Sequence, residues 1–144
     1  MMSSSSIPRV KAALVEHLEA AEWPGARPVV AYGWPRDIGR EIVMIGGTAE
    51  GSQEWVAFGS RQREELYRLE LVVQVMHPGQ AQRAATERAF ELLGVVEAVL
   101  RADPSLGLED TLVAELAVPR LREGPDSEGY VTVVTAGVGI RARI

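Results

Sequence analysis

The amino-acid sequence predicts an α+β fold, a single small domain in which a mostly antiparallel β-sheet has two main helices packed against it. Residues 64–76 alternate between apolar and polar side chains, which is typical of a strand with one buried face. Residues 6–22 and 80–102 repeat apolar side chains every three or four positions, as amphipathic helices do. Four further short segments have strand character. So many strands with so few helices favour an antiparallel sheet with helices against one face.

The strand predicted over residues 64–76 is the element on which we expect the others to assemble. A register shift of one residue would expose its whole apolar side to water, so its register is expected to be firmly set. The strand ends at His77-Pro78-Gly79, because proline cannot continue a ladder and glycine permits a turn. Its apolar side consists of Tyr67, Leu69, Leu71, Val73 and Val75.

The first helix is expected to run from Ser6 to about Glu22. Ser6 is suited to the N-cap position and Pro8 to the first turn. Trp23 precedes a proline, and a residue in that position avoids helical geometry, so the helix ends there. Two strands follow, at residues 28–33 and 41–46. The second is apolar on both faces, which predicts a central or well covered position.

The second half of the chain predicts one long helix and two strands. The helix spans residues 80–102 and is broken by Asp103-Pro104. The strands span residues 112–121 and 130–144, with a loop predicted over residues 123–129.

A proline and two glycines mark irregular places in these last strands. Pro119 places its strand end at a sheet edge or a bulge, because it has no amide hydrogen to donate. Gly137 and Gly139 predict a bulge or a close approach by another backbone.

Residues 46–63 are the least regular stretch of the sequence. Hairpin loops usually take two to five residues, and a longer link is more often functional or disordered. The aromatic residues Trp55 and Phe58 disfavour disorder, so they either fold back on their own core or dock on a neighbour. Arg61 and Arg63 lie close by, and aromatic residues with arginine are the usual anchors of interfaces. We therefore predict Trp55, Phe58, Arg61 and Arg63 as interface residues.

The same region contains a small basic cluster in an acidic chain, formed by Arg61, Arg63 and Arg68. Two interpretations remain open. The arginines pair locally with acidic neighbours, or they dock on an acidic partner surface. The acidic neighbours are Glu64, Glu65 and Glu70.

Composition limits the class of protein. The 144 residues suit one domain, assigned to residues 8–144 after a flexible serine-rich lead-in over residues 1–7. There are no cysteines, so disulfides, thiolate metal sites and cysteine nucleophiles are excluded. Acidic residues outnumber basic ones by 20 to 15, and the net charge of −5 argues against a general nucleic-acid binder. No apolar run reaches the length of a membrane helix, so no membrane partner is expected.

No motif in the sequence predicts catalysis, a cofactor or a metal. The glycines of residues 46–52 lack the lysine and hydroxyl pair of a phosphate loop and predict a plain loop. His17 and His77 are isolated, without the carboxylate spacing of a metal site. The adjacent carboxylates Glu64-Glu65 and Glu109-Asp110 lie where solvated charge is ordinary. We expect no enzymatic activity.

Several segments, taken in order, resemble the tail terminator and tail completion proteins of long-tailed phages and prophages. The likeness covers about Val10 to Ile144 and depends on the order of segments that carry no catalytic signature. These segments are Gln53–Gly59, Arg63–Glu65, Tyr67–Val75, Thr86–Ala89, Leu100–Pro104, Glu115–Leu116, Arg122–Pro125 and the final strand Val138–Ile144.

This resemblance implies a structural protein with a small α+β fold. Such proteins form a homo-oligomeric ring, commonly a hexamer, at the head-proximal end of the tail tube. The ring ends tube polymerisation and meets the head–tail connector, and DNA passes through its lumen without being read. The expected location is therefore the virion tail, after assembly in the host cytoplasm.

Two other functions stay open at this point. A head-closure or neck protein of the same particle would have a similar size. A cytosolic α+β protein that binds a small ligand belongs to a different class, and it would need a pocket with convergent polar groups.

Overall fold

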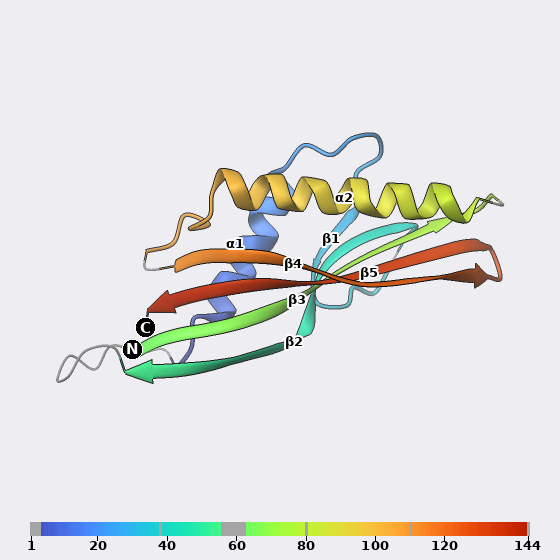
Figure 1. Cartoon of the computed structure of the whole chain (residues 1–144). Helices are drawn as coiled ribbons and strands as arrows, with labels where there is room; N and C mark the ends of the chain where they lie inside the picture. Colours follow the sequence, from blue (N-terminus) through green and yellow to red (C-terminus); the bar gives the residue numbers. More distant parts are fainter. Residues whose placement is uncertain (1–3, 38, 56–62, 80, 110, 144) are drawn as a thin grey trace.

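The computed structural model describes residues 4–37, 39–55, 63–79, 81–109 and 111–143 (Figure 1). They form one α+β domain with a single curved sheet and two helices. In chain order the elements are α1 (Ile7–Ala20), β1 (Val29–Tyr32), β2 (Glu41–Trp55), β3 (Arg63–His77), α2 (Gln82–Ala102), β4 (Thr111–Asp126) and β5 (Gly129–Arg143).

The five strands lie in the order β1-β2-β3-β5-β4, and the predicted fold class is confirmed. β1 runs parallel to β2, and the other neighbouring pairs are antiparallel. β3 is central and pairs along its length with β2 on one side and β5 on the other. The strand expected to organise the chain therefore occupies the middle of the sheet.

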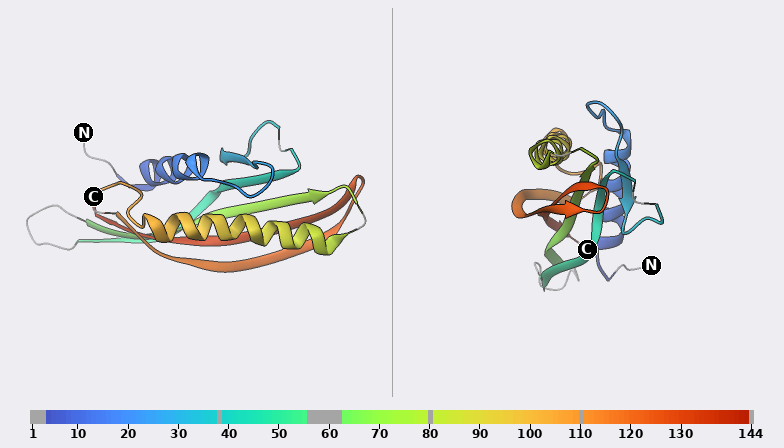
Figure 2. Two further views of the ribbon diagram at one scale, coloured as in Figure 1. Left: turned by 90° about the horizontal axis from the view of Figure 1, so that it is seen from above. Right: turned by 90° about the vertical axis from the view of Figure 1, so that its right-hand side faces the viewer.

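Both helices pack on the same face of the sheet. α2 lies over β3 and β5, and α1 lies beside β1 and β2 (Figure 2). The five predicted core side chains of β3 face them and are between 0% and 6% exposed. Leu66, on the other face of the same strand, is 44% exposed. One hydrophobic core thus joins the helices to the alternating side chains of β3 and β5.

Residues 46–55 are more regular than their sequence predicts, and residues 56–62 lie outside the described residues. β2 continues through the glycine-rich segment as far as Trp55, so the expectation of a plain loop over residues 46–52 is wrong. The pairing of β2 with β3 shifts its register between Ile45 and Ala49 and then resumes. Gly51 is needed there, because a Cβ atom on it would lie 2.1 Å from the Leu66 carbonyl oxygen.

The loop predicted over residues 123–129 is also shorter than expected. β4 extends to Asp126, and only Ser127 and Glu128 separate it from β5. Pro119 is confirmed at an irregularity on an edge strand, since the register of β4 against β5 shifts between Ala117 and Arg120. β2 and β4 are both longer than their sequences predict for the same reason, because strand pairing continues into segments rich in glycine and proline.

Arg88 of α2 binds three parts of the chain together. Its Nε and Nη2 atoms donate to the two carboxylate oxygens of Glu41, over 2.7 and 3.0 Å. Nη1 and Nη2 also donate to the carbonyl oxygens of Pro24 and Ala26, over 2.6 and 2.8 Å. The guanidinium group therefore fixes α2 against the start of β2 and against the connection that follows α1. A planar group with several donors is suited to this role.

His17 makes a second polar link between the helices. Its Nε2 atom lies 2.9 Å from Asp103 Oδ2, and its Nδ1 atom lies 2.8 Å from the Ala13 carbonyl oxygen. Partial burial would lower the pKa of His17, but the hydrogen bonds to Ala13 and Asp103 outweigh it and raise that pKa above 6.5. The hydrogen bond from His17 in turn lowers the pKa of Asp103. His17 therefore holds α1 to the C-terminal end of α2.

We predict that Arg88→Ala lowers the free energy of unfolding by about 2–3 kcal/mol, because it leaves the Glu41 carboxylate and two carbonyl groups without their donor. Arg83→Ala is the matched control, since the Arg83 side chain is 90% exposed in its pair with Glu87. An exposed pair of this kind should contribute less than about 0.5 kcal/mol. Urea unfolding of both variants measures the difference, and equal losses would contradict the assigned role of Arg88.

The link between His17 and Asp103 predicts a pH-dependent stability. The raised pKa of His17 stabilises the fold below pH 6.5, and this contribution is lost as pH rises through the folded value. The lowered pKa of Asp103 stabilises the fold above pH 3.8, and this contribution is lost as pH falls through the folded value. The contribution of the pair is therefore largest near pH 5.

Thermal unfolding of the wild type and of His17→Gln should show the largest difference near pH 5 and a smaller one at pH 8. His77→Gln serves as the control, since His77 forms no ion pair within the described residues. A difference between wild type and His17→Gln that does not change with pH would refute the assigned link.

Candidate functional site

The four predicted interface residues belong to the far end of the β2–β3 hairpin. Trp55 is the last residue of β2, Arg63 is the first of β3, and the two are register partners. Phe58 and Arg61 lie outside the described residues. The structure therefore brings Trp55 and Arg63 to one rung at the end of the hairpin.

The outer half of β2 presents a strand edge. β1 pairs with β2 only from Ile42 to Ile45. Among the described residues, no strand lies beside Ala49–Trp55 on the side away from β3. This end of the sheet extends past both helices (Figure 2). Because an unpaired strand edge is a template for another chain, the hairpin is a candidate contact surface.

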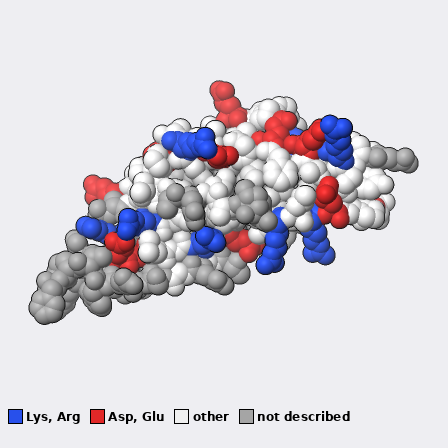
Figure 3. Space-filling view, viewed as in Figure 1, with Lys and Arg blue, Asp and Glu red and all other residues white. Residues whose placement is uncertain are grey.

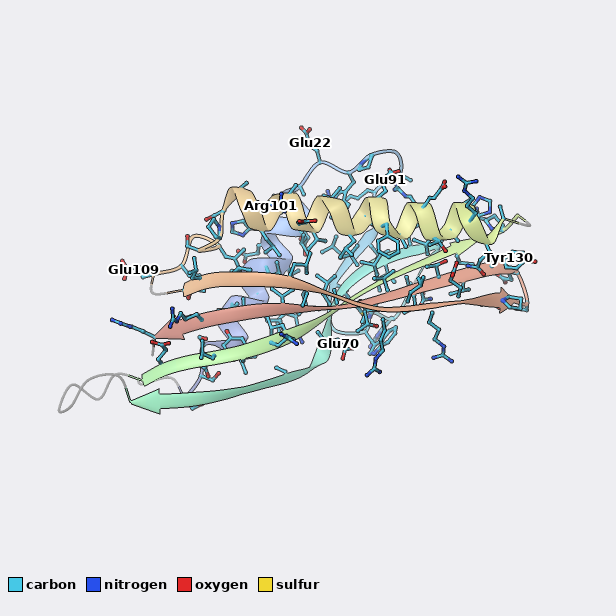
Figure 4. The ribbon with its side chains drawn as sticks, in the orientation of Figure 1. Glu22, Glu70, Glu91, Arg101, Glu109 and Tyr130 are labelled. Atoms are coloured by element: carbon cyan, nitrogen blue, oxygen red, sulfur yellow. The ribbon has the colours of Figure 1, made fainter. Side chains whose placement is uncertain are left out.

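The face of the sheet opposite the helices carries an open depression of about 290 Å³. Arg68, Glu70, Arg120 and Gly137 are among its lining residues, and Figure 4 shows Glu70 on the side away from α2. A Cβ atom on Gly137 would lie 2.3 Å from Arg68 Cδ, so glycine lets the arginine stem cross β5. The close approach expected at Gly137 is thus made by a side chain and not by another backbone.

Two arginines that the sequence reasoning missed lie on this face. Arg120 and Arg122 of β4 are exposed and are register partners of Thr135 and Val133. Neither forms an ion pair with another described residue. Figure 3 shows Lys and Arg side chains projecting below the sheet, away from the helices. Their alternation with Leu121 was visible in the sequence, but the expected strand ended at residue 121.

The adjacent carboxylates Glu64 and Glu65 point to opposite faces of β3. Glu64 accepts a hydrogen bond from Arg141 Nε over 2.8 Å. Glu65 is 3% exposed and accepts the backbone N–H of Ser6 over 2.8 Å and its hydroxyl over 2.6 Å. The two carboxylates therefore cannot act together on one substrate.

Glu65 also explains how α1 begins. Ser6 is the N-cap residue, as expected, but its hydroxyl makes no cap hydrogen bond to the helix. It binds Glu65 instead, and a carboxylate at a helix N-terminus is favoured by the helix dipole. The hydroxyl of Tyr67 lies 2.8 Å from the same serine, and burial raises the pKa of Tyr67 to about 12.

The remaining candidate residues have structural contacts or lie apart. His17 is held by Asp103, and Nδ1 of His77 accepts the backbone N–H of Gly79 over 3.1 Å. Glu109 is exposed, and Asp110 lies outside the described residues. No group of three side chains suited to a metal occurs within the part of the chain that the structure describes.

A second depression, of about 500 Å³, is a place where a small ligand could bind if the protein were a ligand-binding protein and not a virion protein. Its polar lining includes Arg88 and Glu41, which bind each other. Arg27 donates to the Glu19 carbonyl oxygen, and His77 accepts from Gly79. Most of the polar side chains around this depression are therefore already engaged within the chain.

No helix among the described residues is long and apolar enough to cross a membrane.

Comparison with known proteins gives a fold relationship. No protein-family model matches the sequence, and no curated protein matches it. The structure is similar to a chain from the virion of a native gene transfer agent particle. The TM-score is 0.59, the sequence identity is 15%, and the alignment covers 98% of each chain. The two chains therefore share a fold over nearly their whole length.

Proposed function

We propose that the protein is a structural component of a phage-like virion. The observation that carries this proposal is the fold likeness to a chain of the gene transfer agent virion, which covers 98% of both chains. The sequence resemblance to tail proteins of long-tailed phages supports the same class independently of the fold.

Within that class, we propose a tail terminator. It would form a ring of copies, six in number, at the head-proximal end of the tail tube, where it stops tube growth and joins the head–tail connector. The strand edge of β2 and the far end of the β2–β3 hairpin give each copy surfaces for such contacts. The net charge of −5 suits a lumen through which DNA passes without being held.

The second candidate is a head-closure or neck protein of the same particle. The same fold and the same surfaces support it, and only its place in the particle differs. Gold-labelled protein on isolated tails distinguishes the two, because a terminator binds tails that have no head attached, whereas a head-closure protein binds filled heads.

Electron microscopy of the purified protein, alone and with assembled tail tube, tests the ring. Rings with a central hole are the expected result, and light scattering across a concentration series gives the number of copies. A ring is built from a heterologous contact, in which one surface of each copy meets a different surface of the next. A strict monomer in the presence of assembled tube would refute the terminator assignment.

We predict that Trp55→Ala with Phe58→Ala impairs ring formation or tube capping and leaves the subunit folded. Removal of a buried aromatic anchor commonly costs about 2 kcal/mol of association, a loss of roughly thirtyfold. Circular dichroism checks the fold and sedimentation checks assembly. Trp34→Ala is the matched control, since Trp34 is 64% exposed in another connection.

Two results would contradict this prediction. Unfolding of the double variant would place both aromatic residues in the core of the subunit itself. Normal capping would show that the end of the hairpin anchors nothing.

We also propose that the protein has no hydrolase, transferase or metal-dependent activity. His17→Gln with His77→Gln should therefore leave assembly intact at pH 8, where the link between His17 and Asp103 contributes least to stability. Metal analysis of untagged protein is the second measurement. Stoichiometric zinc would count against this proposal.

A further inference from the structure

The exposed charges of α1 and β4 lie at opposite edges of the subunit. α1 contacts β1 and β2, at one edge of the sheet, and β4 forms the other edge. Both views in Figure 2 show α1 and β4 on opposite sides of the molecule. Surfaces placed in this way cannot meet within one subunit, but each can meet the other surface on a neighbouring copy.

The C-terminal half of the outer face of α1 is acidic and has small neighbouring side chains, whereas the exposed Arg9 lies at the other end of the helix and donates to the Arg143 carbonyl oxygen. Glu16 and Glu19 are exposed on successive turns, with Ala12 and Ala20 exposed beside them. Neither glutamate forms an ion pair with a described residue. Residues three apart on a helix have Cβ atoms about 5–6 Å from each other. Glu22, just after the helix, also projects away from the body of the molecule (Figure 4).

The glutamates of α2 are different, because each is neutralised within the helix. Glu87 pairs with Arg83, Glu91 with Arg88, and Glu97 with Arg101. The distances are 2.7, 2.6 and 2.7 Å. Among the described helical residues, the glutamates without an ion pair therefore belong to α1, where Arg27 donates to the Glu19 carbonyl oxygen and not to its carboxylate.

The helix-free side of β4 is complementary to that surface. Arg120 and Arg122 are two residues apart on one strand, so they point the same way with Cα atoms roughly 7 Å apart. Their register neighbours across β5 and β3 are uncharged: Thr135 and Val72 beside Arg120, and Val133 and Gln74 beside Arg122. These two rows contain no acidic residue, and the nearest acidic side chain described on this face is Glu70, which lines the same depression as Arg120.

The backbone of β4 is poorly suited to strand addition. Its register shifts twice, between Val113 and Glu115 and again between Ala117 and Arg120. Bulges, proline and charged residues are the features by which sheet edges avoid pairing with other strands. A contact at this edge is therefore expected to use side chains and not backbone hydrogen bonds.

We propose that α1 of one copy docks against the helix-free side of β4 of the next copy, with Glu16 and Glu19 facing Arg120 and Arg122. The contact is heterologous, so repeating it generates a ring if the rotation closes. This inference rests on the proposed ring function and assigns the surfaces that would join its subunits.

Charge reversal on each surface provides the test. One variant carries Arg120→Glu with Arg122→Glu, and the other carries Glu16→Lys with Glu19→Lys. Each variant alone places like charges against each other, which should raise the concentration needed for assembly by at least roughly tenfold. An equimolar mixture restores opposite charges at every contact, so rings in which the two variants alternate should form. Light scattering and native mass spectrometry measure assembly and composition.

The matched control reverses the charge of two arginines on α2. Arg83→Glu with Arg101→Glu gives the same change in net charge on the outer face of α2, and this variant should assemble like the wild type. Because the chain has no cysteine, Glu19→Cys with Arg120→Cys gives a second measurement. Oxidation should give a ladder of cross-linked multimers, whereas either single cysteine variant should not.

Several outcomes would overturn the contact. It fails if wild-type rings form and either charge-reversal variant assembles like the wild type, or if the mixture of folded variants does not assemble. It also fails if the arginine variant forms normal rings but loses binding to a duplex DNA probe, which would assign the arginines to phosphates. If the wild type stays monomeric with tail tube, the ring function fails together with the contact. The results in which wild-type rings form leave the ring function intact and overturn only the contact. Failure of the contact can therefore be told apart from failure of the ring function.

Discussion

The pairing of β3 on both of its edges, together with the burial of one of its faces, is the constraint on which the rest of the structure depends. Its register with β2 and β5 is set because a shift of one residue would move its apolar side chains from the core into water. Those side chains, from Tyr67 to Val75, are the surface on which both helices pack. The sheet order follows as well, since the strand that pairs on both sides must lie in the middle. The position of every other element is therefore defined relative to this strand.

Two charged side chains, one buried and one partly buried, then fix the helices on that surface. Glu65 reaches the N-terminus of α1, and Arg88 joins α2 to Glu41 and to the connection after α1. Hydrophobic contact alone is tolerant of small sliding movements, whereas a charge-assisted hydrogen bond requires one geometry. These contacts position the outer face of α1 relative to the edge of β4. The arrangement of charges from which we infer assembly thus depends on polar groups inside the subunit.

The two edges of the sheet differ in regularity and in charge, and this difference bears on the proposed function. β4 is irregular and carries arginines, so it resists strand pairing and offers side chains. The outer half of β2 continues without a strand beside it in the described structure and ends at Trp55. The proposed ring would need different surfaces on the two sides of each copy. An irregular charged edge and an extended hairpin are surfaces of that kind.

The sequence by itself determined the local elements, because helix and strand periods, prolines and turn residues act over a few positions. It therefore predicted both helices, the register-setting alternation of β3 and the irregularity at Pro119. The tertiary structure decided what depends on partners distant in the chain. β2 extends through its glycines because β3 supplies hydrogen bonds, Glu65 is buried because Ser6 covers it, and Arg68 crosses Gly137 because their strands are neighbours. The placement of α1 and β4 at opposite edges likewise follows from strand order, which no local pattern encodes.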